Sequence, residues 1–198
     1  MSKLTIIIFV LAFILNSCSN TFKAFNPSIN IQNKLESTQI EREANLLNML
    51  NSIRVKDNNC SQAVSKLILD DKLSLAAKMH AKDMAYNHFV RHDGSGTETD
   101  EAKKKLGVGS LFNERLVYFG FRAPKGTISG ENIVKIDIDK DSNTTESNFK
   151  KALLGLSLSK SQCQILMNPQ FKYVGIGYFN DNNSYYWTLD YAQEKSQQ

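Results

Sequence analysis

The 198-residue sequence lacks an apolar run long enough to cross a membrane as a helix. Its longest such run, residues 4–15, is interrupted only by Thr5 and spans about 12 residues, whereas a transmembrane helix needs about 20. Lys3 precedes the run, and the small residue Ser17 follows it shortly afterwards. A charged start, a short apolar run and small residues near its end are typical of an export signal.

A basic stripe is also missing. The chain has 24 Lys and Arg against 20 Asp and Glu, for a net charge of +4, and the two signs are mixed along the sequence. The exception is Lys103-Lys104-Lys105, which is better interpreted as the solvated face of a helix. Nucleic-acid binding usually needs a basic stripe or a recognisable module, so we expect no nucleic-acid partner. There is no internal repeat, and the roughly 180 residues after the signal suit one domain.

Cysteines are few, and the first of the three follows the apolar run. The segment Leu15-Asn16-Ser17-Cys18 resembles a bacterial lipobox, in which the signal is cut before a cysteine that is then acylated. It predicts a signal peptide at residues 1–17 and a lipid on Cys18; a plain secretory signal is the alternative. Residues 18–37 show no clean periodicity and are expected to be a tether, followed by a domain at 38–192 and a tail at 193–198.

Cys60 and Cys163 are the remaining cysteines. Exported compartments oxidise thiols, so an even pair there is more often a disulfide than two free thiols. A loop of roughly 100 residues closed by such a bridge contributes about 4–5 kcal/mol in the chain-entropy model. The sequence around Cys163 leaves two other roles open, a nucleophile and a metal ligand.

Hydrophobic periodicity predicts helices early in the domain and paired strands late. Thr38-Gln39-Ile40-Glu41 is a capping box, from which a helix should run to about Lys56. Further segments are expected as follows: helices at 71–88, 101–106, 111–118 and 145–156, a strand at 132–138, and a hairpin of strands within 171–179 and 184–192. This order indicates an α+β fold with an antiparallel sheet covered by helices.

Several short motifs occur in a fixed order along the domain. The most specific are Gly130-Glu131-Asn132-Ile133 and the segment from Asn168-Pro169 to Val174-Gly175-Ile176-Gly177. The remaining ones are Leu50-Asn51…Arg54, Leu73-Ser74…Ala77, Ala81-Lys82-Asp83-Met84-Ala85, Phe89-Val90-Arg91-His92-Asp93-Gly94, Arg115…Gly120-Phe121, Ser159…Cys163…Leu166-Met167 and Tyr186-Trp187-Thr188. Over about residues 40–191 the chain resembles the CAP superfamily (cysteine-rich secretory proteins, antigen 5, pathogenesis-related 1 proteins), in its bacterial SCP-domain branch.

The resemblance implies a three-layer α-β-α sandwich with a central antiparallel sheet, helices on both faces and an open cleft. In many members that cleft holds two histidines and two acidic residues that can bind a divalent metal such as zinc. His92 and Glu131 match two of these positions, and Gln162 stands where the second histidine would be. The second glutamate has no match at 153–157. His92, Glu131 and Gln162 are therefore the expected cleft residues.

His92 and Glu131 are the candidate catalytic and metal-binding residues, although a zinc site needs three or four ligands. His88 would restore a second imidazole if the helix continued through both histidines. His80 is expected to be a core histidine with one nitrogen hydrogen bonded. Glu131 has an alternative role, which is to cap backbone amides beside the strand.

The resemblance also places a cysteine partner for Cys163 near the end of the first helix, where Cys60 lies. With half of the cleft set missing, the chain is expected to be a lipid-anchored, non-catalytic binding or scaffold module of the bacterial cell envelope. It would need no cofactor; its partners would be the membrane, through Cys18, and a lipid, glycan or envelope-protein ligand. The alternative is a metal-dependent hydrolase or peptidase that uses His92 and Glu131.

Overall fold

The computed structural model describes residues 27–58, 60–139 and 144–196. The predicted signal peptide and Cys18 lie outside these residues. The chain divides into two compact units, Met1–Glu36 and Ser37–Gln198. All that follows on the sheet, its helices and the candidate site concerns the second unit.

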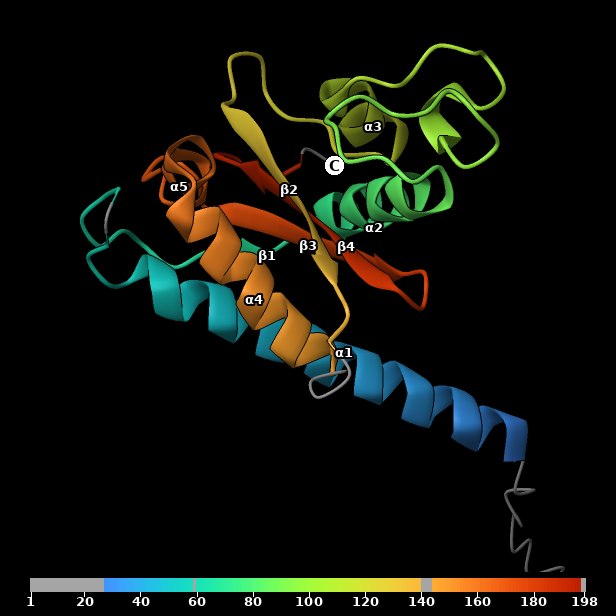
Figure 1. The fold of residues 1–198 in the computed structure, drawn as a ribbon, viewed down its shortest axis with the longest axis horizontal. Helices are drawn as coiled ribbons and strands as arrows, with labels where there is room; N and C mark the ends of the chain where they lie inside the picture. The colour runs from blue at the N-terminus through green and yellow to red at the C-terminus, as the bar shows by residue number, and fades with distance from the viewer. Residues whose placement is uncertain (1–26, 59, 140–143, 197–198) are drawn as a thin grey trace, which may run out of the picture. The chain divides into compact units, whose positions relative to one another are not determined.

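The elements follow one another as helices first and a hairpin last (Figure 1). The α-helices are α1 (Pro27–Arg54), α2 (Asp71–Tyr86), α3 (Phe112–Tyr118), α4 (Thr145–Leu158) and α5 (Lys160–Leu166). The strands are β1 (Ile68–Leu69), β2 (Ser129–Asp137), β3 (Tyr173–Asn180) and β4 (Ser184–Ala192), and a short 3-10 helix, η1, covers Glu101–Lys103.

The four strands form one sheet in the order β1-β3-β4-β2. The β3–β4 hairpin and the β2–β4 pair are antiparallel, whereas the short β1 pairs with β3 in parallel. The α+β sandwich predicted from the sequence is confirmed, and the two-residue β1 adds one parallel pair to it. The register places Glu131 opposite Asp190 and Asp137 opposite Ser184, at the two ends of β2.

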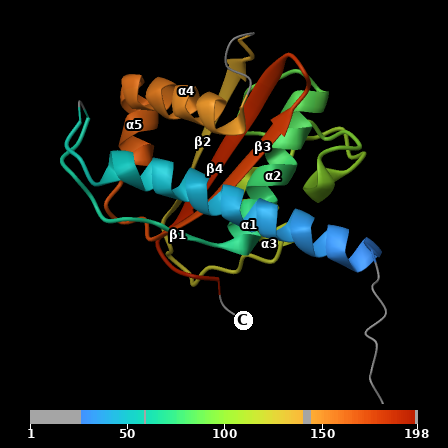
Figure 2. The same ribbon diagram turned by 90° about the horizontal axis from the view of Figure 1, so that it is seen from below.

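Side chains alternate between the two faces of this sheet because successive residues of a strand point in opposite directions. Trp187 and Tyr191 of β4 face one side, where they join Phe149 of α4, Leu166 of α5 and Leu50 of α1 in the main hydrophobic core. Figure 2 shows α4 and α5 on this side of the sheet, with α2 on the other. Burial on both faces explains why β4 is buried along its whole length.

Helix α2 covers the second face at very short range. A Cβ atom on Gly177 of β3 would lie 2.1 Å from the carbonyl carbon of Ala77, and one on Gly175 would lie 2.0 Å from that of Leu73. Only glycine lets two backbones approach this closely. The Gly-Ile-Gly stretch of β3 therefore sets the distance between α2 and the sheet, and with it the depth of the polar side chains between them.

Arg54, the last residue of α1, is completely buried and ties three segments together. Its Nε donates to the carbonyl of Ser65 at 3.1 Å, and its guanidinium nitrogens donate to the carbonyls of Leu166 and Asn168. Those carbonyls belong to the end of α5 and the turn after it, where helix carbonyls have no partner within the helix. A charged donor suits this position because the C-terminal end of a helix carries partial negative charge.

Three sequence predictions about helices were wrong. The helix predicted at residues 101–106 is only the 3-10 helix η1 at Glu101–Lys103. Helix α1 begins at Pro27 instead of at the Thr38 capping box, so residues 27–37 of the predicted tether are helical. Proline is favoured at the first helical position, and Gln32, Lys34, Leu35 and Glu36 are good helix formers. Helix α2 ends at Tyr86, before the predicted end at residue 88.

Candidate functional site

A network of buried carboxylates fixes the long segment between α2 and β2. Asp83, on α2, accepts hydrogen bonds from the amide of Ser95 (2.8 Å) and from the hydroxyl groups of Ser95 (2.6 Å) and Thr99 (2.6 Å). Asn87 donates to it as well, at 2.9 Å. The segment therefore keeps a defined course over α2 although it contains little regular structure.

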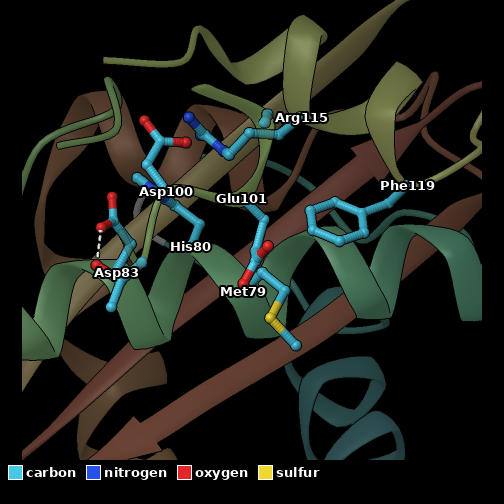
Figure 3. Close-up of a pocket in the computed structure, with 9 residues that line it drawn as sticks. Met79, His80, Asp83, Asp100, Glu101, Arg115 and Phe119 are labelled. Atoms are coloured by element: carbon cyan, nitrogen blue, oxygen red, sulfur yellow. Dashed lines mark hydrogen bonds between the residues drawn. The ribbon is translucent and has the colours of Figure 1, made fainter. Parts of the chain in front are cut away.

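Asp100 holds the next part of the same segment. Its Oδ2 accepts from the amides of Gly96 (3.0 Å) and Ser110 (2.8 Å). Burial raises the pKa of Asp100, but these hydrogen bonds and the nearby charge of Arg115 outweigh it and keep the pKa below its ordinary value. Figure 3 shows Arg115 reaching from α3 toward Asp100 and His80. The negative charge of Asp100 therefore lies near the buried guanidinium of Arg115.

Arg115 joins α3 to the sheet. Its Nη1 donates to the carbonyl of Ser110 at 3.0 Å, and its Nη2 lies 2.7 Å from Oε2 of Glu131. Arg115 is 2% exposed and Glu131 is 4% exposed, so the pair is shielded from solvent. A charge-assisted hydrogen bond of this length between buried groups is among the stronger polar contacts in proteins. One oxygen of Glu131 is thereby occupied.

The other oxygen of Glu131 is occupied by His92. Nδ1 of His92 lies 2.7 Å from Oε1 of Glu131, and the imidazole is half exposed. This hydrogen bond raises the pKa of His92 above its ordinary value, because it outweighs the lowering effect of burial. Burial alone would raise the pKa of Glu131, but the hydrogen bond from His92 and the charge of Arg115 hold it below its usual range. The structure therefore brings together two of the three expected cleft residues as a hydrogen-bonded pair.

His80 lies beneath this pair. It is 1% exposed; its Nε2 lies 3.0 Å from the carbonyl oxygen of Arg91 and 4.0 Å from Oε2 of Glu131. Burial lowers the pKa of His80 to about 4, against a weaker opposing effect of Glu131. It is a neutral core histidine near neutral pH, as its position on the apolar face of α2 predicts.

Gln162 lies on the opposite side of the sheet. Its Oε1 and its carbonyl accept from Nδ2 of Asn132, at 2.5 Å and 3.1 Å. Asn132 follows Glu131 along β2, so the two side chains point to opposite faces. The sheet therefore separates the amide of Gln162 from the His92–Glu131 pair.

His88 does not supply a second imidazole on the helix. The backbone of His88 has φ of 53°, and α2 has already ended at Tyr86. Its side chain is 77% exposed and lies 3.9 Å from the carboxylate of Asp181, between Nδ1 and Oδ2. The H-x-x-x-H hypothesis, which needed a helix through both histidines, is wrong.

The residues present do not fit a zinc site. A protein zinc site has at least three protein ligands. Within residues 27–58, 60–139 and 144–196, no group of three or more His, Cys, Asp or Glu is placed to hold a metal ion. Both oxygens of Glu131 are bound by other side chains, and the Arg115 guanidinium at 2.7 Å would repel a cation.

Two buried polar groups of this region were not assigned a role from the sequence. Asp190 is completely buried opposite Glu131, and burial together with the charge of Glu131 raises its pKa well above the ordinary value. The signal for Asp190 is a carboxylate within the apolar run of β4. In the sequence, Arg115 was identified only as part of a motif. The comparable signal for its buried role is that this charged residue directly precedes Leu116, which is buried as well.

Cys60 and Cys163 form a disulfide, with their Cα atoms 6.1 Å apart, as predicted. It joins the loop after α1 to α5 across 103 residues of sequence. Neither cysteine is therefore a thiolate nucleophile or a metal ligand. In the described part of the chain no helix has both the length and the apolar character of a membrane span.

Comparison with known proteins agrees with this architecture. An extracellular protein containing an SCP domain from Bacillus anthracis aligns at 24% identity with a TM-score of 0.53, over 77% of this chain and 41% of its own. The present chain thus spans less than half of that protein. An outer surface protein from Borrelia burgdorferi aligns at 14% identity with a TM-score of 0.50, over 81% of this chain and 94% of its own. No curated protein matches.

The model of the Cysteine-rich secretory protein family (CAP) matches residues 47–191, which is the part of the chain that carries α2, the sheet and the Glu131 network. The match covers the motifs around Glu131 and β3 and more than half of the sequence. The chain belongs to the CAP family.

Proposed function

We propose that this protein is an exported, lipid-anchored CAP-domain protein whose domain binds a ligand without catalysing a reaction. The observation that carries the proposal is the occupancy of Glu131. Its two carboxylate oxygens are held at 2.7 Å by His92 and at 2.7 Å by Arg115. The residue that a hydrolase would use as an acid or base is engaged in holding α3 and the loop before it on the sheet.

The electrostatics of the pair support this proposal. A general acid or base works best with a pKa near the operating pH. The pKa of Glu131 is lowered, which makes it a weak base that has already lost its proton. Hydrolysis by covalent catalysis also needs a nucleophile within hydrogen-bond reach of the base. In the described part of the chain, the hydrogen bond that His92 makes goes to the carboxylate of Glu131 and not to a side chain that could act as the nucleophile.

Export and anchoring rest on other observations. The Cys60–Cys163 disulfide is typical of oxidising compartments outside the cytosol. The sequence before Cys18 resembles a lipoprotein signal, and two proteins of similar fold are described as extracellular or as outer surface proteins. Cys60 and Cys163 pair with each other, so acylation of Cys18 would take no cysteine from the disulfide.

Anchoring is tested by phase separation in detergent and labelling with radioactive palmitate. The native chain should enter the detergent phase and carry the label, while Cys18→Ala should stay aqueous and unlabelled. A Cys60→Ala/Cys163→Ala chain is the matched control and should still be labelled. Equal labelling of native protein and Cys18→Ala would overturn the anchor.

A hydrolase remains the second candidate for one reason. The contact of Glu131 with Nδ1 fixes the orientation of the His92 ring. The His92 side chain is half exposed, so its Nε2 is the atom that could exchange a proton with a substrate. Ester, peptide and glycoside substrates should be assayed with the native chain, His92→Ala and Glu131→Gln, with and without added zinc. We expect no turnover. Turnover that is lost in His92→Ala would overturn the proposal and establish the enzyme.

A further inference from the structure

A hollow lies at the end of the sheet that is remote from Glu131. It has a volume of about 360 Å³ and is formed by the end of α2 and the β3–β4 turn. Ligand pockets in proteins commonly range from about 300 to 1,000 Å³. Its walls are made by Ala85, Tyr86, His88, Phe179, Asn180, Asp181 and Asn182. None of these residues belongs to the Glu131 network.

One wall of the hollow is aromatic. Tyr86 is 58% exposed although it is a large side chain at the end of a helix. Its ring lies 5.3 Å from that of Phe179, at an interplanar angle of 54°. This contact holds the tyrosine ring in place while it stays accessible. An exposed aromatic ring of fixed orientation offers a flat apolar surface on which a ligand can stack.

The residues of the β3–β4 turn that line the hollow are polar, and hydrogen bonds within the turn orient them. Oδ1 of Asp181 accepts from the amides of Asn183 (3.0 Å) and Ser184 (2.7 Å), which orients the carboxylate. Its Oδ2 lies 3.9 Å from Nδ1 of His88, longer than a hydrogen bond, and the hydroxyl group of Tyr186 interacts with the same carboxylate. Oδ1 of Asn180 accepts from the amide of Asn182 at 2.6 Å, which leaves the Nδ2 group of Asn180 as a donor toward a ligand. The same hollow is therefore lined by an exposed aromatic ring and by polar groups that can accept and donate hydrogen bonds.

The charges around the hollow decide between ligand classes. Aromatic rings beside a carboxylate also attract cations such as quaternary ammonium groups. Here, however, Nζ of Lys82 already lies 5.7 Å from the centre of the Tyr86 ring. A second cation on that ring would be repelled, and an anion would meet the carboxylate of Asp181. The hollow suits a neutral molecule with an apolar face and several hydroxyl groups.

We infer that this hollow is a carbohydrate-binding site that takes a pyranose unit of a neutral glycan. The C–H face of the sugar ring stacks on the part of the Tyr86 ring that Lys82 and Phe179 leave exposed, and the hydroxyl groups donate to Asp181 and accept from Asn180. This inference rests on the proposed function and deepens it, because it names the ligand class of the binding domain. No bond is formed or broken at the site.

The test is saturation-transfer NMR on the full chain in a detergent without a sugar headgroup. The probes are maltotriose, cellotriose, mannotriose and N,N′,N″-triacetylchitotriose, with choline chloride as the cationic probe. We expect saturable binding of at least one trisaccharide, in the millimolar range, and none of choline. Tyr86→Ala should weaken that binding about tenfold or more.

Tyr118→Ala is the matched control. Tyr118 is 56% exposed, lies at the end of α3 and packs against Phe119 at 4.9 Å between ring centres, outside the hollow. Its loss should leave sugar binding within about twofold of the native value. Asp181→Asn keeps an oxygen for the turn amides but removes the carboxylate, and it should weaken binding while the urea unfolding midpoint stays unchanged.

Three results would overturn the inference: no trisaccharide binds, choline binds instead, or Tyr86→Ala binds sugar as the native chain does. Absence of sugar binding together with absence of turnover contradicts the carbohydrate site and leaves the non-catalytic proposal standing. Cleavage of a bound trisaccharide has the opposite meaning, because the site would be supported and the non-catalytic proposal would fail.

Discussion

Glu131 on β2 and Asp190 on β4 lie directly opposite each other in the sheet, and both carboxyl groups are buried on the face that α2 covers. Their environments drive the two pKa values apart. Hydrogen bonding by His92 and the charge of Arg115 keep Glu131 ionised against the effect of its burial. Burial and the charge of Glu131 raise the pKa of Asp190 well above its ordinary value. The two facing carboxyl groups therefore favour opposite protonation states.

Asp190→Asn should stabilise the protein at neutral and alkaline pH. A folded-state pKa above the unfolded value of about 3.9 means that the stability from the protonated carboxyl is complete below that pH and is lost as the pH rises through the folded-state pKa. Asparagine stays neutral throughout and avoids this loss. Urea unfolding at pH 4.5 and pH 8 should show a gain that is larger at pH 8. A gain that is equal at both pH values, or a loss at pH 8, would contradict the assignment.

Arg115→Met should destabilise the fold by about 3–5 kcal/mol, because it leaves Glu131 buried without the buried positive charge beside its Oε2. Arg122, an exposed arginine close to it in sequence, is the control, and Arg122→Met should change the free energy of unfolding by less than about 0.5 kcal/mol. Adding Glu131→Gln to Arg115→Met should recover part of the loss, since the unpaired charge is then gone. Denaturant unfolding of these three variants and of Glu131→Gln alone measures the four values, and additive losses in the double variant would argue against a direct pair.

His92 should titrate above its ordinary value, because the hydrogen bond to Glu131 raises its pKa. The stability that this contact gives is present below the unfolded-state pKa of about 6.5 and is lost as the pH rises through the higher folded-state value. Glu131→Gln should shift the pKa of His92 downward, as followed by NMR of the imidazole resonances. Asp93→Asn should shift it by less, because Asp93 is a smaller contributor. Equal shifts in the two variants would speak against the contact with Glu131.

Replacing glycine with alanine should have opposite effects on stability at two positions of the chain. Gly177→Ala forces a methyl group against the backbone of α2, at 2.1 Å from a carbon of Ala77, and should cost about 3 kcal/mol. Gly155 lies exposed inside α4 with open space around its Cα, so Gly155→Ala should stabilise the protein by up to about 1 kcal/mol. Thermal unfolding of both variants distinguishes close approach of α2 from a general effect of removing glycine.

The hydrophobic period in the sequence predicted most of the fold because it records which face of each element is buried. The alternation at residues 132–138 and in the β3–β4 hairpin is such a record, and so is the stripe of α2. Helix α5 was not predicted because its seven residues are too short to show a period. The start of α1 was misplaced because Thr38-Gln39-Ile40-Glu41 has the composition of a cap, and local composition does not exclude an earlier start at Pro27.

The site was predictable only where the family motif names a residue. His92 and Glu131 were identified in this way, but their partners depend on the folded structure. Arg115 reaches Glu131 from a separate helix, and Asp190 meets it through the pairing of two strands that lie far apart in the sequence, which no local pattern encodes. The position of Gln162 was likewise beyond the sequence, since the side of the sheet that it occupies follows from the way α5 packs.

The central claim has two parts. Glu131 stabilises the fold through its contacts with His92 and Arg115, and the domain binds a ligand without catalysing a reaction. The most direct test is a calorimetric titration of zinc into the native chain beside His92→Ala. We predict no binding that depends on His92, since Arg115 and His92 occupy both oxygens of Glu131. Stoichiometric zinc binding that disappears in His92→Ala would contradict the account and make metal-dependent chemistry its replacement.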